Sequence, residues 1–157
     1  MEKIIPEFLL ITQNVDNLHR RAGNSKLIEL HGNIFKAYCT SCNYKKIWEN
    51  PPVNFSVLCP ECNSHLRPDI LWFGETYDTN KLETSINFIL ESDLLFIIGT
   101  SGQVTVPVQL AMEGIEKGIP SIEINPEKST ISGHVTHFIQ EKAGSFLDDF
   151  WKKIDLL

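Results

Sequence analysis

The sequence predicts an α/β protein with a Rossmann-like parallel sheet, into which a small four-cysteine zinc ribbon is inserted. Three observations carry this prediction. Short apolar runs alternate with amphipathic segments, turn residues separate them at short intervals, and all four cysteines fall within one stretch. Strands that alternate with helices over short connections favour a parallel sheet covered on both faces. We therefore predict a Rossmann-like domain over 1–35 and 73–157 and a zinc-binding module over 36–72.

Each predicted strand is a short apolar or alternating run that a turn residue follows. The predicted strands are Glu7–Thr12, Leu27–His31 with Gly32 as its break, Leu94–Ile98 and Ser121–Asn125. The predicted helices follow the amphipathic spacing and its stop signals, such as Gly118 with Pro120 just beyond. They are a turn over Asn17–Ala22, a helix that opens near Asp78 or Thr79, one over about Val108–Lys117 and one from Ser145 onward.

Composition narrows the class of protein. The chain has 157 residues, of which 42% are hydrophobic, which is enough for one globular core and a small satellite module. No apolar run approaches the roughly 20 residues that cross a bilayer, and the opening residues lack a signal-peptide pattern. The formal net charge of −6 argues against binding nucleic-acid phosphates and favours basic partners such as lysine-rich segments. We expect a cytoplasmic protein without membrane or direct nucleic-acid contact.

The cysteines form two knuckles, Cys39-x2-Cys42 and Cys59-x2-Cys62. Each knuckle can aim two sulfurs at one point, and two knuckles together close a tetrahedral zinc site. Two disulfides or four free thiols are the alternative, which an intracellular setting disfavours in the case of disulfides. Four thiolates leave no open coordination position, so we predict a structural zinc ion.

Polar residues follow three of the predicted strands, at the sheet edge where open parallel sheets bind ligands. They are Gln13-Asn14-Val15-Asp16, Gly99-Thr100-Ser101-Gly102 and Asn125-Pro126-Glu127. Gly99 and Gly102 let the backbone approach a phosphate closely. Each segment alone is weak evidence, but three on successive strands predict a nucleotide site.

His31 ends a strand just ahead of the zinc insert. A single histidine is more often a structural residue than a catalytic one. This histidine lies at the seam between two modules, where clefts form, and its ordinary pKa suits a general base near neutrality.

Together these residues resemble a known family. Thr12-Gln13-Asn14-Val15-Asp16-Asn17-Leu18-His19, Leu30-His31-Gly32, the paired knuckles, Arg67-Pro68-Asp69, Phe73-Gly74-Glu75 and Gly99-Thr100-Ser101 occur in the order found in sirtuins. From about Phe8 to its C-terminus the chain resembles a bacterial-type sirtuin, which is an NAD-dependent protein lysine deacylase. The resemblance implies transfer of an acyl group from lysine to NAD, giving nicotinamide and O-acyl-ADP-ribose.

The resemblance also implies roles for individual residues. It makes His31 the general base. The implied NAD contacts are Gln13, Asn14 and Asp16 at the nicotinamide end, Gly99, Thr100 and Ser101 at the phosphates and ribose, Asn125 and Glu127 near the adenosine ribose, and Ala143 near adenine. The implied substrate edges are Phe73, Gly74 and Glu75 on one side and the segment around Val104 on the other, between which an acyl-lysine peptide adds as a strand.

One departure from the family separates two hypotheses. Sirtuins carry a Gly-Ala-Gly turn that cradles the NAD diphosphate, and these 157 residues hold no such turn, so we expect the sheet to be incomplete at its N-terminal end. The first hypothesis is an NAD-dependent deacylase, completed where necessary by another polypeptide. The second is a truncated, catalytically inactive module that binds zinc and nucleotide or peptide.

Overall fold

The computed structural model describes residues 1–54 and 56–154, and these form two compact units. The first unit runs from Met1 to Glu83 and the second from Thr84 to the C-terminus. The predicted division into a zinc module over 36–72 and a surrounding nucleotide-binding domain stays a prediction. The two units are described one at a time.

The first unit opens with a parallel pair of strands. β1 (Leu10–Thr12) pairs with β2 (Leu27–Glu29), and the short helix α1 (Leu18–Arg21) lies between them in the sequence. Both strands start or end inside the predicted ranges because their pairing covers only three residues, from Leu10 opposite Leu27 to Thr12 opposite Glu29. The backbone N–H of Leu30 then donates to the Thr12 carbonyl at 2.9 Å, which keeps the end of β2 beside the end of β1.

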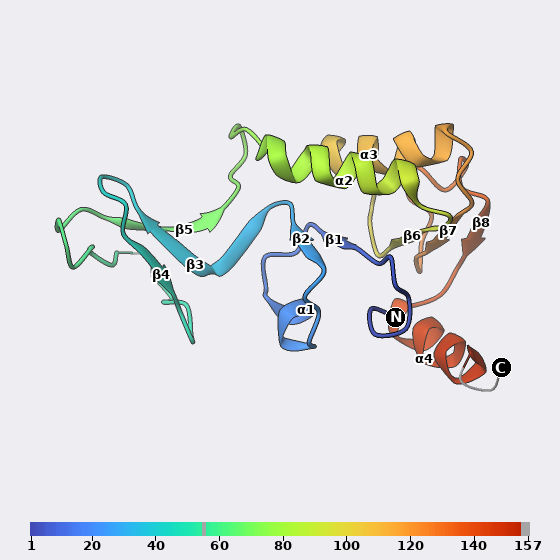
Figure 1. Cartoon of the computed structure of the whole chain (residues 1–157), viewed down its shortest axis with the longest axis horizontal. Helices are drawn as coiled ribbons and strands as arrows, with labels where there is room; N and C mark the ends of the chain where they lie inside the picture. The colour runs from blue at the N-terminus through green and yellow to red at the C-terminus, as the bar shows by residue number, and fades with distance from the viewer. Residues whose placement is uncertain (55, 155–157) are drawn as a thin grey trace. The chain divides into compact units, whose positions relative to one another are not determined.

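An antiparallel ribbon makes up the rest of the first unit (Figure 1). β3 (Gly32–Cys39) is its central strand, with β4 (Lys45–Ile47) on one side and β5 (Leu66–Ile70) on the other. The expectation that Gly32 breaks the strand pattern is wrong in one respect, because Gly32 is also the first residue of β3. The ribbon has a small core in which four side chains are buried: Ala37, Cys39, Cys59 and Leu66.

The second unit contains a three-stranded parallel sheet in the order β6-β7-β8. β6 (Leu95–Ile98) and β7 (Ser121–Ile124) match two predicted strands, and β8 (His137–Ile139) was not predicted. β8 is only three residues long and pairs with β7 from His137 to Ile139. A run this short carries too little alternation to be recognised before its partner strand is known.

Helices cover both faces of this sheet (Figure 1). Ile97 of β6 packs with Ala111 of α3 (Thr105–Glu116). The neighbouring residue Phe96 contacts Phe150 of α4 (Ala143–Ile154) edge to face at 6.0 Å. Because successive strand side chains point to opposite faces, α3 and α4 lie on opposite sides of the sheet, as a Rossmann-like fold requires.

The helix starts show which local signals worked. α2 (Thr79–Glu91) begins where predicted, and the Asp78 carboxylate caps it by accepting from the backbone N–H groups of Asn80 and Lys81 at 2.9 and 3.2 Å. α3 begins three residues before the predicted Val108, since proline at position 107 is tolerated in the first turn. α4 begins at Ala143, ahead of the predicted Ser145. None of the helices in the described residues is both long and apolar enough to cross a membrane.

Candidate functional site

The loop that follows β1 is held in place by the beginning of β3. Asn17 has a left-handed backbone (φ 63°), and its Oδ1 accepts from Nδ2 of the buried Asn33 at 2.8 Å. The Val15 carbonyl accepts from the backbone N–H of Ile34 at 2.9 Å. Two hydrogen bonds from one strand therefore fix the loop that carries Gln13, Asn14 and Asp16.

The three predicted residues of this loop differ in their surroundings. Asn14 is exposed, and its backbone N–H donates to Thr12 Oγ1 at 3.1 Å. Asp16 is half-buried, and its Oδ1 accepts from the backbone N–H of Leu18 at 3.0 Å. The backbone carbonyl of Gln13 is a hydrogen-bond partner of His31. The structure thus brings Gln13 into contact with the predicted base.

Beneath this loop lies a buried acidic group that the sequence did not reveal as important. The Glu29 side chain is 6% exposed, and its Oε2 accepts from Arg20 Nη2 at 3.1 Å and from Lys36 Nζ at 3.0 Å. Its Oε1 accepts from Nδ2 of Asn33, the same amide that holds Asn17. Burial raises the pKa of Glu29, but the hydrogen bonds from Arg20, Lys36 and Asn33 outweigh burial and bring that pKa below its ordinary value.

His31 follows Glu29 by two residues and is half-buried. Its Nε2 lies 2.8 Å from the hydroxyl of Tyr77. Burial lowers the pKa of His31, because desolvation disfavours the imidazolium, and the hydrogen bond to the Gln13 carbonyl partly opposes this shift. The imidazole is therefore neutral near pH 7, which is the form that can accept a proton.

Gly32 fixes His31 against the ribbon. It has a φ of 79°, and a Cβ at this position would lie 2.0 Å from the backbone oxygen of Asp69. The backbone N–H of Leu71 donates to the His31 carbonyl at 2.9 Å. Only glycine permits this close approach, so the position of His31 depends on the residue that follows it.

The predicted peptide edge in the first unit is braced by an ion pair. Arg67 donates from Nη1 and Nη2 to the two carboxylate oxygens of Glu75 at 2.6 and 2.8 Å. Glu75 also accepts from the backbone N–H of Trp72 at 3.0 Å, and these bonds from Arg67 and Trp72 lower the pKa of Glu75 to about 2. Between them, Phe73 is fully exposed and Gly74 has a φ of 87°. The turn therefore presents its apolar tip to solvent while its base is fixed.

The second unit contains the other half of the predicted polar residues. Gly99 and Gly102 have φ values of 65° and 71°, and the backbone N–H of Gly102 donates to Thr100 Oγ1 at 3.2 Å. Asn125, which is 8% exposed, donates from Nδ2 to the Thr100 carbonyl. Thr100 and Asn125 thus lie side by side at the carboxyl ends of β6 and β7. This is the edge at which parallel sheets bind ligands.

The remaining predicted residues of the second unit are less enclosed. Ser101 and Glu127 are exposed, Val104 is 39% exposed just before α3, and Ala143 is the first residue of α4. Sequence reasoning missed Glu123, the central residue of β7, which is completely buried. Its Oε2 has no hydrogen-bond partner among the described residues. A glutamate between two isoleucines in a strand was the available signal.

The four cysteines come together as the knuckle spacing predicts. Their sulfur atoms all lie within 4.8 Å of one another, and all four are free thiols. The Cys39 and Cys62 sulfurs are 3.3 Å apart and the Cys42 and Cys59 sulfurs 3.6 Å apart. A tetrahedral zinc with Zn–S bonds of about 2.3 Å places its sulfurs roughly 3.8 Å apart, so the cluster is the right size for zinc.

The electrostatics of the cluster also fit a dication. A hydrogen bond from the Tyr44 backbone lowers the pKa of Cys42, but desolvation and the neighbouring sulfurs outweigh it and raise that pKa to about 12. Hydrogen bonds from Ser64 lower the pKa of Cys62 to about 6. Four crowded thiols cannot all ionise without a cation, and Zn²⁺ supplies the charge that four thiolates require.

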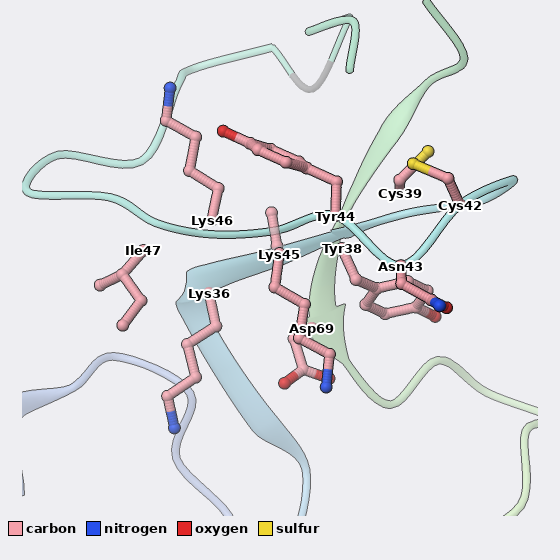
Figure 2. Close-up of a pocket in the computed structure, with 11 residues that line it drawn as sticks. Lys36, Tyr38, Cys39, Cys42, Asn43, Tyr44, Lys45, Lys46, Ile47 and Asp69 are labelled. Atoms are coloured by element: carbon pink, nitrogen blue, oxygen red, sulfur yellow. The ribbon is translucent and has the colours of Figure 1, made fainter. Parts of the chain in front are cut away.

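Beside the cysteines, the ribbon carries a basic groove of about 550 Å³ (Figure 2). Figure 2 shows the Cys39 and Cys42 sulfurs close together near one end of the groove, with Tyr44 and Lys45 along its length. Lys46 lies over the Trp48 ring at 4.4 Å. None of the predicted nucleotide or peptide residues lines this groove, so it is distinct from the candidate active site.

The geometry can now be compared with known proteins. The sequence model of the Sir2 family matches residues 1–106. The chain belongs to the Sir2 family. A Leptospira interrogans protein named "NAD-dependent protein deacylase" is 47% identical over 98% of this chain and 63% of its own length. An Aeropyrum pernix protein with the same name is 43% identical over 88% of this chain and 57% of its own length.

Solved structures agree with this membership. A Sir2 homologue in complex with NAD matches with a TM-score of 0.88 and 34% identity, covering 94% of this chain and 58% of that one. A Sir2 protein bound to an acetylated peptide matches with a TM-score of 0.87 and 28% identity, covering 96% of this chain and 65% of that one. The α/β fold predicted for this Sir2-family chain is therefore confirmed. The chain spans less than two thirds of the length of these relatives.

Proposed function

We propose that this Sir2-family chain takes part in the NAD-dependent removal of acyl groups from protein lysine side chains, giving nicotinamide and O-acyl-ADP-ribose. The observation that carries the proposal is His31. It is half-buried and neutral near pH 7, and Gln13 and Tyr77 hold its ring. Relatives named NAD-dependent protein deacylases support the same chemistry.

His31 is proposed as the general base. NAD supplies a ribose carbon that an acyl oxygen can attack, with nicotinamide as the leaving group. His31 then accepts the proton of a ribose hydroxyl, and the lowered pKa of its imidazole keeps it in the accepting form at neutral pH. Gln13, Asn14 and Asp16 are proposed to hold the nicotinamide end, from the loop that β3 fixes.

The second unit is proposed to hold the remainder of the nucleotide. The Nδ2 of Asn125 already donates to the Thr100 carbonyl, so its Oδ1 faces away and can accept from a sugar hydroxyl. Gly99, Thr100 and Ser101 are proposed for the phosphates and ribose, with Glu127 and Ala143 toward adenosine. The positive φ of Gly99 supports this role, because glycine allows the backbone to approach a ligand closely.

The acyl-lysine peptide is proposed to bind as an added strand. Phe73 and Gly74 form an exposed turn whose base Glu75 fixes, and Val104 offers a partly exposed apolar side chain. Extended peptides gain affinity from main-chain hydrogen bonds to such edges, and exposed apolar side chains add contacts. Cys39, Cys42, Cys59 and Cys62 hold a structural zinc that takes no part in the chemistry, since four thiolates leave no open position.

The test is nicotinamide release from NAD in the presence of an acetyl- or succinyl-lysine peptide. The chain is compared with His31→Tyr and with a matched control, His134→Tyr, which changes an exposed histidine of the second unit. We expect turnover by the unaltered chain and by the control, and none by His31→Tyr. Equal turnover by all three proteins, or turnover without NAD, would refute the assignment of His31.

A second candidate is a binding module that is inactive by itself. The observation that favours it is the coverage, since the chain spans 63% of the Leptospira interrogans relative. It predicts no turnover by the unaltered chain, with zinc still bound and nucleotide or acyl-peptide binding still measurable by calorimetry. Activity that appears only when another polypeptide carrying a Gly-Ala-Gly turn is added would assign the chain to a two-part enzyme.

A further inference from the structure

Tyr77 lies where a proton must arrive if His31 is a base. Its hydroxyl oxygen is 2.8 Å from His31 Nε2, and the two rings are tilted by 56° with their centres 5.6 Å apart. The two residues are 46 positions apart in the sequence, and neither the strand pattern nor the family motifs singled out Tyr77. Burial raises the pKa of Tyr77, so its hydroxyl keeps its proton and can donate at neutral pH.

The partners of the ring decide which nitrogen carries the proton. The Gln13 carbonyl can only accept, so the ring nitrogen that faces it must carry a hydrogen. With the Tyr77 oxygen at Nε2, the nitrogen left for Gln13 is Nδ1. A neutral imidazole has one N–H, so Nε2 holds the lone pair and Tyr77 is the donor.

The backbone on both sides of Tyr77 is anchored. Glu75, two residues before it, is bound by both terminal nitrogens of Arg67. Asp78, directly after it, caps α2 through the backbone N–H groups of Asn80 and Lys81. A side chain between two fixed points has little freedom to leave, which favours a lasting contact with His31 over a transient one.

We propose that Tyr77 is a positioning residue for His31: its hydroxyl donates to Nε2 and, together with the Gln13 carbonyl at the other ring nitrogen, locks the orientation and tautomer of the imidazole. The inference concerns the same site as the proposed deacylase function and rests on it for its catalytic meaning. Two hydrogen bonds at opposite ring nitrogens prevent the ring from flipping, which either bond alone would permit. The lone pair that accepts a proton is thereby aimed at one fixed point.

The contact itself can be tested without any turnover, by ¹⁵N NMR of the histidine side chains. His31→Gln assigns the His31 signals by their loss. In the unaltered chain at a pH where His31 is neutral, we expect Nδ1 to carry the proton and Nε2 to show the signal of a hydrogen-bonded lone pair. In Tyr77→Phe, which keeps the ring but lacks the hydroxyl, the Nε2 signal should move toward that of an unbonded lone pair.

The matched control is Tyr44→Phe, which removes a tyrosine hydroxyl from the zinc ribbon and should leave the His31 signals unchanged. A proton on Nε2 in the unaltered chain, or the same Nε2 signal in Tyr77→Phe, overturns the proposal. The first of these measurements needs no substitution at Tyr77, so it decides the matter even if Tyr77→Phe does not fold.

Kinetics separate positioning from mere occupancy. Loss of one orienting hydrogen bond should lower kcat of Tyr77→Phe by about tenfold with little change in the KM for NAD. A lower KM with unchanged kcat would mean that Tyr77 only fills the place of the ligand, and the positioning role would be wrong. If the unaltered chain shows no turnover, the proposed function fails, while the NMR result still decides whether Tyr77 holds His31.

Discussion

Removing the charge of Glu29 tests whether the buried ion cluster holds the loop beneath the candidate site. Glu29→Gln keeps the shape of the side chain but leaves Arg20 and Lys36 without an anion. Breaking a fully buried pair costs about 3–5 kcal/mol, and exposed pairs contribute about 0–1 kcal/mol. Glu29 is 6% exposed, but Arg20 and Lys36 are 39% and 37% exposed and can turn to water. We therefore expect a loss of about 2–3 kcal/mol in the free energy of unfolding.

The assay is urea unfolding followed by circular dichroism at pH 7 with zinc in excess, so that the metal site is equally loaded in every protein. The matched control is Glu49→Gln, which removes an exposed carboxylate from the ribbon and should change the free energy of unfolding by less than about 0.5 kcal/mol. A loss for Glu29→Gln no larger than that of the control would refute the reasoning, and so would a gain in stability.

The same cluster has a defined dependence on pH. Because the folded state lowers the pKa of Glu29, the carboxylate contributes its stability above the unfolded pKa of about 4.3. That contribution is lost as the pH falls through the lower, folded value. The difference in stability between the unaltered chain and Glu29→Gln should therefore shrink in acid. A difference that grows below pH 4 would contradict the pairing.

Three further predictions concern the ribbon and the turn beside it. A strong zinc chelator, or Cys62→Ser, should unfold the ribbon, as loss of near-ultraviolet circular dichroism and faster proteolysis between β3 and β5 would show, because the core of the ribbon includes two of the ligands. Gly32→Ala should cost more than about 3 kcal/mol by urea unfolding, since its Cβ would meet the Asp69 backbone at 2.0 Å. Arg67→Met should raise the pKa of Glu75 from about 2 toward its ordinary value, measured by NMR titration of its carboxyl carbon. An unchanged titration would show that Arg67 is not the main cause of the shift.

The zinc site was predictable from the sequence because its geometry is local. A C-x2-C turn already brings two sulfurs together, so only the meeting of two turns was left to the fold. The strand-end residues were predictable for a related reason. Parallel strands bring their carboxyl ends to one edge, which placed Thr100 beside Asn125 from their positions in the sequence alone.

Other features depended on partners far away in the sequence. The alternating pattern shows that Glu29 lies in a strand, yet a strand glutamate ordinarily faces water, and only the fold brings Lys36 and Asn33 around it. The ribbon strand β3 escaped prediction because half-buried residues on a strand with two neighbours do not alternate clearly.

The sequence by itself determined the family, the zinc ligands and the identity of the candidate base, since these depend on residue type and short spacing. Only the tertiary structure decided how that base is held. Tyr77 reaches His31 across 46 residues, and no local pattern records such a contact. Burial and hydrogen-bond partners set the protonation of His31, and both are properties of the packed chain, which the order of its residues does not display.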